Sequence, residues 1–433
     1  MSVRDDAEAI APELVGLRRA IHREPEIGLD LPGTQRKVLA ALDGLPLEIS
    51  LGTALSSVTA VLRGEGAKGG GPVVLLRGDM DALPVAERTG LDYASQIDGV
   101  MHACGHDLHT AMLAGAARLL AARRRELPGT VVFMFQPGEE GHAGARHMIS
   151  EGVLDAAGQR PVAAYALHVA SADWPAGVCS TRPGPMLAAA EILAVTVHGH
   201  GGHGSEPHHA ADPIPAACEM VTALQTLVTR RFDVFDPVVI TIGSFHAGTT
   251  DNVIPDDATF LATVRSFSPE ARDRVRESAL ALVGGIAAGH GLTVSAEFRD
   301  GYPVTVNDEA ETRFAAGVAA GLLGEEHCLA QPNPMTGAED FSFVLEQVPG
   351  AFLMLGACPP GADPATPPTT TQPTPCSTTR CWPPARRSTP SSRFSAWPSH
   401  SRRRARRARP GHRHGRGPRG GNSPIGNRIG LAR

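Results

Sequence analysis

The sequence predicts an α/β protein in which a smaller β-α-β-β-α-β domain is inserted into a domain built on a mixed sheet. Three apolar segments, Val58–Arg63, Val73–Leu76 and Val131–Phe135, predict strands of a sheet that is covered on both faces. After about Pro183, strand and helix patterns alternate in a different order. The 433 residues, 42% of them hydrophobic, are enough for two or three domains.

Composition excludes several classes of protein. The 7 Cys show no paired spacing, so a disulfide framework is not expected and a reducing compartment, the cytoplasm, is favoured. The N-terminus lacks the apolar stretch of a secretory signal, and no run of about 18 apolar residues predicts a membrane span. We therefore expect a cytoplasmic protein without a membrane partner.

The first elements lead to a pair of acids. An amphipathic helix is expected over Asp5–Arg23, and Pro12 indicates that this helix kinks or begins there. The strand Val73–Leu76 runs on towards Asp79 and Asp81, which stand two residues apart and so point the same way. A solvated loop is the alternative interpretation.

The segment Met101–Thr110 places one thiol and three imidazoles ahead of a helix expected over His109–Arg125. Cys104 and His106 lie two residues apart, in a stretch too tight to be a regular helix, so both can point into one cavity. Thiolate and imidazole are preferred ligands of zinc-like cations. A buried thiol beside a capping histidine is the alternative.

Further candidate ligands follow two more strands. Glu139 and Glu140 come after Val131–Phe135, between glycines that free the backbone to present them. One carboxylate can bind a metal while its neighbour acts as a base, although a surface acidic turn is also possible. His168 ends the strand Val162–Leu167, where a lone His is commonly structural. Because sites in open α/β sheets form at the carboxyl ends of strands, one shared site is the economical interpretation.

The inserted domain is expected over residues 183–299, which leaves residues 1–182 and 300–357 for the other domain. Its predicted elements, in β-α-β-β-α-β order, are Glu191–His198, Asp212–Thr229, Val238–Ser244, Thr259–Ser266, Pro269–Gly289 and Leu292–Phe298. Glycines on both sides of His203 suggest that this imidazole approaches something closely, although His-rich loops can be merely solvated. A helix over Glu309–Leu323 and a strand over Ala351–Leu355 complete the mixed-sheet domain.

The globular pattern stops at Cys358. Residues 358–433 contain 14 Pro, 15 Arg, no Lys and one acid, which predicts a disordered tail. This tail carries +14, and the chain's net charge of -5 therefore leaves -19 for residues 1–357. The Arg run invites a nucleic-acid interpretation, but the acidic body and the lack of an aromatic stacking platform oppose it, so no nucleic-acid partner is expected.

Seven motifs, in order between about Pro12 and Gly356, together resemble peptidase family M20. The resemblance is strongest to its hippurate hydrolases, N-acyl-amino-acid deacylases and plant auxin-conjugate hydrolases. The motifs are Arg77–Pro84, His102–Asp107, Gln136–Gly141, Leu167–Val169, Gly201–Ser205, Asn252–Pro255 and Gly337–Phe341.

The resemblance implies a zinc-peptidase-like catalytic domain, an inserted ferredoxin-like dimerisation domain and two divalent metal ions, such as Zn²⁺ or Mn²⁺. The metal ligands that it implies are Cys104, His106, Glu140 and His168. The catalytic residues that it implies are Glu139, as general base, and Asp81, in support. The substrate-binding residues that it implies are His203, which reaches the partner's active site in a homodimer, and Asn252 and Arg265, which hold the substrate carboxylate.

The expected function is that of a metal-dependent amidohydrolase, which cleaves the linear amide bond of small N-acylated amino acids such as hippurate or N-acetyl-amino acids. A catalytically impaired relic, or a homolog that only binds metal, is the alternative. The resemblance implies a last His ligand shortly after Gly356, but no His occurs between Gly356 and Ser399. A frameshift from about Cys358 would explain both this loss and the change of composition, and a natural basic extension is the competing explanation.

Overall fold

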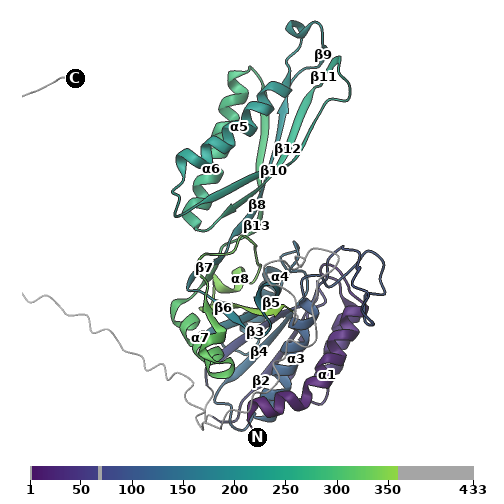
Figure 1. The fold of residues 1–433 in the computed structure, drawn as a ribbon, viewed down its shortest axis with the longest axis vertical. Helices are drawn as coiled ribbons and strands as arrows, with labels where there is room; N and C mark the ends of the chain where they lie inside the picture. Colours follow the sequence, from purple (N-terminus) through teal and green to yellow (C-terminus); the bar gives the residue numbers. More distant parts are fainter. Residues whose placement is uncertain (1, 67–70, 359–433) are drawn as a thin grey trace, which may run out of the picture. The chain divides into compact units, whose positions relative to one another are not determined.

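The larger of the two main sheets is a mixed sheet of eight strands (Figure 1). The computed structural model describes residues 2–66 and 71–358, so the expected tail lies outside the described residues except for Cys358. The strands, in sheet order, are β1 (Glu48–Leu51), β2 (Val58–Arg63), β4 (Thr130–Gln136), β3 (Val73–Asp79), β5 (Ala163–Pro175), β16 (Gly350–Cys358), β6 (Cys179–Thr181) and β15 (Cys328–Ala330). The expectation of a mixed sheet is confirmed: β3, β4 and β5 are parallel, whereas β2 is antiparallel to β4.

Six α-helices accompany this sheet in the described residues. They are α1 (Val3–Arg23), α2 (Pro32–Leu42), α3 (His106–Ala122), α4 (Gly144–Ser150), α7 (Glu309–Leu323) and α8 (Ser342–Leu345). The side chain of Ser2 caps α1 by accepting the N–H of Asp5, so this helix begins at Val3 and Pro12 lies inside it. The alternative that the helix begins at Pro12 is therefore wrong. No helix in the described ranges combines the length and apolar character needed to cross a membrane.

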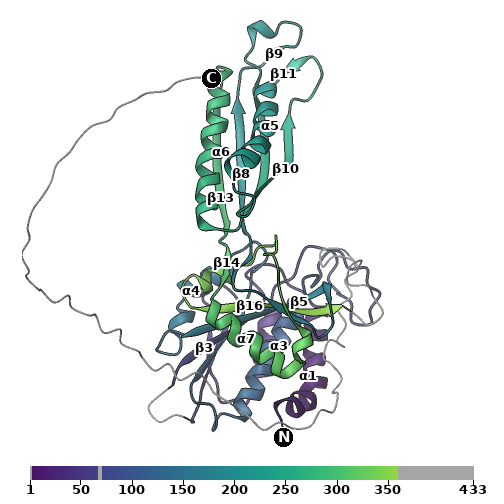
Figure 2. The same cartoon turned by 60° about the vertical axis from the view of Figure 1, so that its left-hand side comes forward.

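A second, four-stranded sheet has the order β10-β12-β8-β13 and is antiparallel throughout. Its elements are β8 (Ala189–His198), α5 (Pro213–Arg231), β10 (Val238–Ala247), β12 (Asp257–Ser266), α6 (Pro269–Gly289) and β13 (Thr293–Tyr302). Helices α5 and α6 cover one face of this sheet and share an apolar core with it (Figure 2). The strand order is that of a split βαβ unit, as expected. The domain boundaries themselves stay a prediction.

The remaining elements are short. They are β7 (Gly184–Leu187), which pairs with β14 (Thr305–Asn307), β9 (Gly202–His203), which pairs with β11 (Val253–Ile254), and the 3₁₀ turns Val153–Asp155, Pro207–His209 and Glu325–His327.

Two expected boundaries near the candidate ligands are wrong. Helix α3 begins at His106 rather than at His109, because Gly105 takes a φ of 87° and turns the chain directly into the helix. Strand β5 continues to Pro175, so His168 lies within a strand rather than at its end. The reason is β16, which pairs with β5 beyond the last residue that pairs with β3.

Candidate metal centre

Parallel pairing brings three segments to one edge of the larger sheet. β3 pairs with β4 up to Asp79 opposite Gln136, and with β5 up to Arg77 opposite Ala166. The loops that follow β3 and β4, and the part of β5 beyond Ala166, therefore lie beside one another. These are the segments that carry the expected acids and His168.

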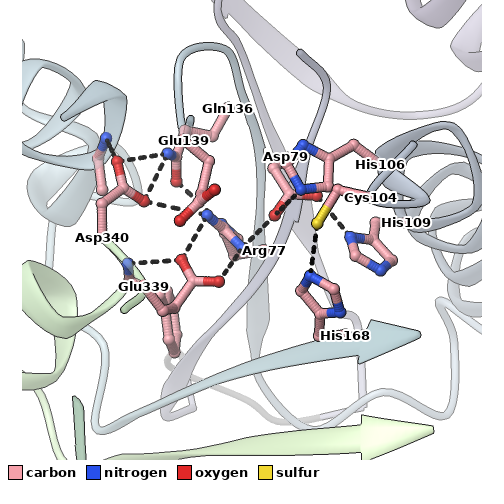
Figure 3. Close-up of polar contacts among 12 residues, drawn as sticks. Arg77, Asp79, Cys104, His106, His109, Gln136, Glu139, His168, Glu339 and Asp340 are labelled. Atoms are coloured by element: carbon pink, nitrogen blue, oxygen red, sulfur yellow. Dashed lines mark hydrogen bonds and ion pairs between the residues drawn. The ribbon is translucent and has the colours of Figure 1, made fainter. Parts of the chain in front are cut away.

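One thiol and two imidazoles form the centre of the candidate site (Figure 3). Sγ of Cys104 lies 3.3 Å from Nε2 of His168, and Nε2 of His106 lies 4.0 Å from Oε1 of Glu140. Donor atoms of Cys104, His106 and His168 all lie within 4.8 Å of one another, and the same holds for His106, Glu139 and Glu140. Because both groups include His106, the structure brings all four predicted ligands together, with Glu139 beside them.

The hydrogen bonds of two histidines leave one ring nitrogen of each available. Nδ1 of His168 donates to the backbone oxygen of Val169 at 2.6 Å, so its Nε2 keeps a lone pair, and burial lowers the pKa of His168 to about 3. Nδ1 of His106 lies 3.3 Å from Oδ1 of Asp81, whereas its buried Nε2 has no hydrogen-bond partner in the described part of the chain. Buried polar atoms without a partner are rare, and metal-bound histidines typically use one nitrogen for the metal and the other for a carboxylate or carbonyl. These residues therefore fit a divalent cation.

The charges around this position favour a cation. Burial would lower the pKa of His106, but Asp79 and Cys104 raise it well above its ordinary value. Burial raises the pKa of the Cys104 thiol to about 12, so this thiol would have to lose its proton when a cation binds. The surrounding acids thus stabilise positive charge at this position, which a bound metal ion would also supply.

His109 lies in the same cluster but has no free nitrogen. Its Nε2 accepts the backbone N–H of Val169 at 2.8 Å, so its Nδ1 carries the proton and donates to Oδ1 of Asp79 at 2.6 Å. Both nitrogens are therefore occupied by the protein. We conclude that His109 orients Asp79 and the start of the Val169 segment, and that it is not a candidate ligand.

Asp81 shapes the turn that presents the two glutamates. Its Oδ1 accepts the backbone N–H of Glu139 at 3.0 Å, and its Oδ2 accepts the backbone N–H of Glu140 at 2.9 Å. The hydroxyl of Tyr302 donates to the backbone oxygen of Glu139. Gly138 has a φ of 74°, and a Cβ there would lie 2.5 Å from a Leu29 methyl group, so this turn requires glycine. These contacts give Asp81 a positioning role in the turn.

The two glutamates differ in their surroundings. Glu139 is buried, and burial, followed by the neighbouring Glu339 and Asp340, raises its pKa well above the ordinary value. Glu140 is more accessible, and burial also raises its pKa. A carboxyl group whose pKa is raised by burial can carry a proton close to neutral pH, which is a property of catalytic acids and bases.

A buried ion-pair network, which the sequence analysis missed, lies next to Glu139 (Figure 3). Arg77 donates to Asp79 at 2.6 Å, to Glu339 at 2.8 Å and to Asp340 at 3.0 Å. Although burial would raise it, Arg77 holds the pKa of Asp79 well below its ordinary value. The one signal in the sequence was a charged residue near the end of an otherwise apolar strand, followed at once by acids.

Two further polar residues of the segment Met101–Thr110, Asp107 and His102, lie beside His22 of α1. Oδ2 of Asp107 lies 2.6 Å from Nε of Arg18 and 2.8 Å from Nδ1 of His22, which ties α3 to α1. The ring of His102 lies 6.2 Å from that of His22, and both are buried. Of the three imidazoles in the segment Met101–Thr110, only His106 thus joins the group of candidate ligands.

Of the predicted substrate-binding residues, Arg265 lies on the second sheet, His203 on β9 and Asn252 directly before β11. His203 pairs with Val253 of β11, and its Nδ1 accepts from the hydroxyl of Ser205 at 2.8 Å. The backbone oxygen of Asn252 accepts the N–H of Gly204 at 2.8 Å, so Asn252 lies close to His203 in space. Arg265 lies on β12 and is half-buried. The substrate roles of all three residues stay predictions.

Comparisons with known proteins place the chain in a family. The model of peptidase family M20/M25/M40 matches residues 75–370. Thermostable carboxypeptidase 1 of Saccharolobus solfataricus is 36% identical over 82% of this chain and 88% of its own length. N-acetylcysteine deacetylase of Bacillus subtilis is 38% identical over 81% of this chain and 89% of its own length.

A solved structure agrees with the two sequence relatives. The YXEP protein of Bacillus subtilis, described as a dinuclear metal binding peptidase from the M20 family, superposes with a TM-score of 0.70 and 35% identity, covering 83% of this chain and 92% of that one. The expected resemblance is confirmed by the matched range, by these identities and by the shared fold. The chain belongs to peptidase family M20/M25/M40 and is a hydrolase of that family.

Proposed function

We propose that this chain is a metal-dependent amidohydrolase that cleaves the amide bond of small N-acylated amino acids. The observation that carries the proposal is that donor atoms of Cys104, His106 and His168 lie within 4.8 Å of one another, as do those of His106, Glu139 and Glu140. The Bacillus subtilis deacetylase, which by its name acts on an N-acetylated amino acid, supports this substrate class. Hippurate and N-acetyl-amino acids are the substrates that we expect.

The residues that would hold two divalent cations, such as Zn²⁺ or Mn²⁺, are Cys104, His106, Glu140 and His168. The description of the YXEP protein as dinuclear supports two ions rather than one. When bound, such cations polarise an amide carbonyl and lower the pKa of a water molecule from about 15.7 towards 7.

Glu139 is the proposed general base. Its carboxylate takes a proton from the attacking water and later returns that proton to the leaving nitrogen. Its raised pKa suits both transfers, since the carboxyl group must hold the proton between the two steps. Asp81, through its hydrogen bonds to the N–H groups of Glu139 and Glu140, keeps the two carboxylates in their separate positions.

The proposed substrate contacts come from the second sheet. Arg265 and Asn252 would hold the carboxylate of the amino acid, for which a planar guanidinium is well suited. His203 would donate to the developing oxyanion in the active site of a partner subunit. A homodimer through the second sheet is supported by the segment before β10, where Val234 is 79% and Phe235 is 93% exposed.

A catalytically impaired homolog is the second candidate. The described residues supply four ligands, whereas the family resemblance implies a fifth after Gly356, where no His occurs before His400. With one ligand missing, the site would bind one of its two metal ions weakly. The chain would then keep metal binding and lose most of its turnover.

Hydrolysis of N-acetyl-amino acids and hippurate, with added Mn²⁺ or Zn²⁺, tests the proposal. We expect metal-dependent release of the amino acid, and no release by the Glu139→Gln variant. A peptide substrate is assayed in parallel, because the relative from Saccharolobus solfataricus is named a carboxypeptidase. Metal binding without turnover of any substrate favours the impaired homolog, and turnover of peptides alone contradicts the assigned substrate class.

A further inference from the structure

Residues of α3, α7 and the larger sheet line an apolar groove. It has a volume of about 480 Å³, and Met112 of α3 and Leu353 of β16 contribute to its lining. Three side chains spaced four residues apart on α7 line it as well and are strongly exposed: Phe314 by 42%, Val318 by 48% and Leu322 by 55%. A stripe of this kind is the face that a helix normally buries against another element.

The chain itself continues from the groove. Leu353 and Leu355 of β16 line it, and β16 is the last described element, after which residues 359–433 follow. With the 14 Pro and 15 Arg found from Cys358 onwards, this sequence has no apolar periodicity that would match the stripe on α7. We therefore consider which residues the same codons would encode in another reading frame.

The genetic code limits which residues can be encoded in the reading frame that starts one base earlier. Each triplet of that frame joins the last base of one codon to the first two bases of the next. Codons for Cys, Phe and Trp, and four of the six Ser codons, begin with T, so these residues put T in the middle of the earlier-frame triplet. Every triplet with T in the middle encodes Phe, Leu, Ile, Met or Val.

Applied to residues 376–397, this rule predicts an apolar pattern. The triplets over Cys376, Cys381, Trp382, Phe394 and Trp397 are apolar whatever codon is used, and those over Ser377, Ser388, Ser391, Ser392 and Ser395 are apolar where the Ser codon begins with T. The triplet over Trp382 takes its first base from the Cys381 codon, and because both Cys codons end in a pyrimidine it encodes only Leu. The triplet over Pro383 begins with the last G of the Trp codon and encodes only Ala. Positions 381, 388, 392 and 395 fall on one face of an α-helix.

The polar positions change in a consistent way. Pro codons, and Arg codons that begin with C, become triplets for Ser, Pro, Thr or Ala. Where the codons of Arg380, Arg386, Arg387 and Arg393 begin with C, their positive charges therefore disappear. The triplets over Thr369, Thr370 and Thr371 can each encode only Tyr, His, Asn or Asp. This restricted choice contains the His that the family resemblance leads us to expect shortly after Gly356.

We propose that the groove lined by α3 and α7 is the seat of an amphipathic helix that codons 376–397 encode in the frame one base earlier. This inference goes beyond the proposed function and does not depend on it. The helix covers Phe314, Val318 and Leu322 with its apolar face, and the frame changes between codons 358 and 369.

The nucleotide sequence of the gene is the first test. We expect an open frame over codons 369–397, with apolar residues at positions 381, 388, 392 and 395. A stop triplet in that frame, or polar residues at two or more of these four positions because the Ser codons begin with A, would overturn the proposal.

The second test compares the chain with its present C-terminus and a frame-corrected chain. We expect correction to raise the midpoint of thermal unfolding by about 5 °C or more. Val318→Asp should lower the midpoint of the corrected chain by about 4 °C or more, because it buries a charge in the occupied groove. Ala320→Asp is the matched control, since Ala320 lies on the same helix but outside the groove lining.

In the chain with its present C-terminus the two substitutions should have equal, small effects. An equal effect of Val318→Asp and Ala320→Asp in the corrected chain would contradict the proposal. So would a dimer of the present chain that Val318→Asp converts into monomers, because the occupant of the groove would then be a second copy.

Discussion

Sγ of Cys104 and Nε2 of His168 lie 3.3 Å apart, although 64 residues separate them in the sequence. The contact depends on Gly105, which turns the chain into α3. It also depends on β5, in which His168 lies beyond Ala166, the last residue that pairs with β3. A Cβ on Gly105 would lie 2.5 Å from a methyl carbon of Val169. The backbone at both ends of the contact thus permits this close approach, which supports the proposal that the two residues bind a metal.

The adjacent glutamates should separate into two roles. Glu139→Gln removes the proposed base and should abolish turnover while metal content stays at the wild-type value. Glu140→Gln removes a proposed ligand and should lower metal content. Metal analysis of both purified variants, beside an activity assay, checks the division, and equal metal loss in the two would show that it is wrong.

His109 should behave as a structural residue. His109→Ala leaves the backbone N–H of Val169 and Oδ1 of Asp79 without this hydrogen-bond partner, which costs about 1–3 kcal/mol of unfolding free energy. Metal content should not change. Urea unfolding and metal analysis measure both effects, with the exposed His198→Ala as a control that should shift stability by less than about 0.5 kcal/mol. Loss of metal from the His109 variant would make His109 a ligand.

Arg77 should be among the costliest positions to replace. Arg77→Met leaves Glu339 and Asp340 buried without their cation, and breaking a buried pair in this way costs about 3–5 kcal/mol. Arg299→Met removes an exposed pair with Glu297 and should cost about 0–1 kcal/mol. Chemical denaturation compares the two, and similar losses would mean that the buried network contributes little to stability.

A homodimer that shares residues between its active sites should show complementation. Glu139→Gln and His203→Ala chains, each inactive alone, should recover activity when mixed, because one hybrid site then has both residues intact. Glu139→Gln mixed with Cys104→Ala is the control and should stay inactive, since both residues belong to one site. The frame-corrected chain or an intact relative provides the active background. Sedimentation as a monomer at micromolar concentration would count against the dimer.

Sequence patterns predicted most elements, because apolar periodicity records which face of each strand or helix is buried. The range Pro269–Gly289 was predicted to the residue, and the order of the second sheet followed from the order of its elements. That Cys104, His106, Glu140 and His168 lie close together was also expected, although His168 lies within β5 rather than at its end.

Other features depend on contacts that no local pattern contains. The length of β5 is set by pairing with β16, which lies far along the chain. The tautomer of His109 is fixed by the backbone N–H of Val169, which donates to its Nε2. The role of Arg77 depends on Glu339 and Asp340, which lie 262 and 263 residues away in the sequence.

Metal content tests the central claim most directly. The wild-type chain, Cys104→Ala and Cys218→Ala are each loaded with Zn²⁺ or Mn²⁺, dialysed and analysed for bound metal per chain; Cys218 is exposed on α5 and serves as the matched control. We expect the Cys104 variant to lose bound metal relative to the wild type and the Cys218 variant to keep it. Wild-type stoichiometry in the Cys104 variant would contradict the account.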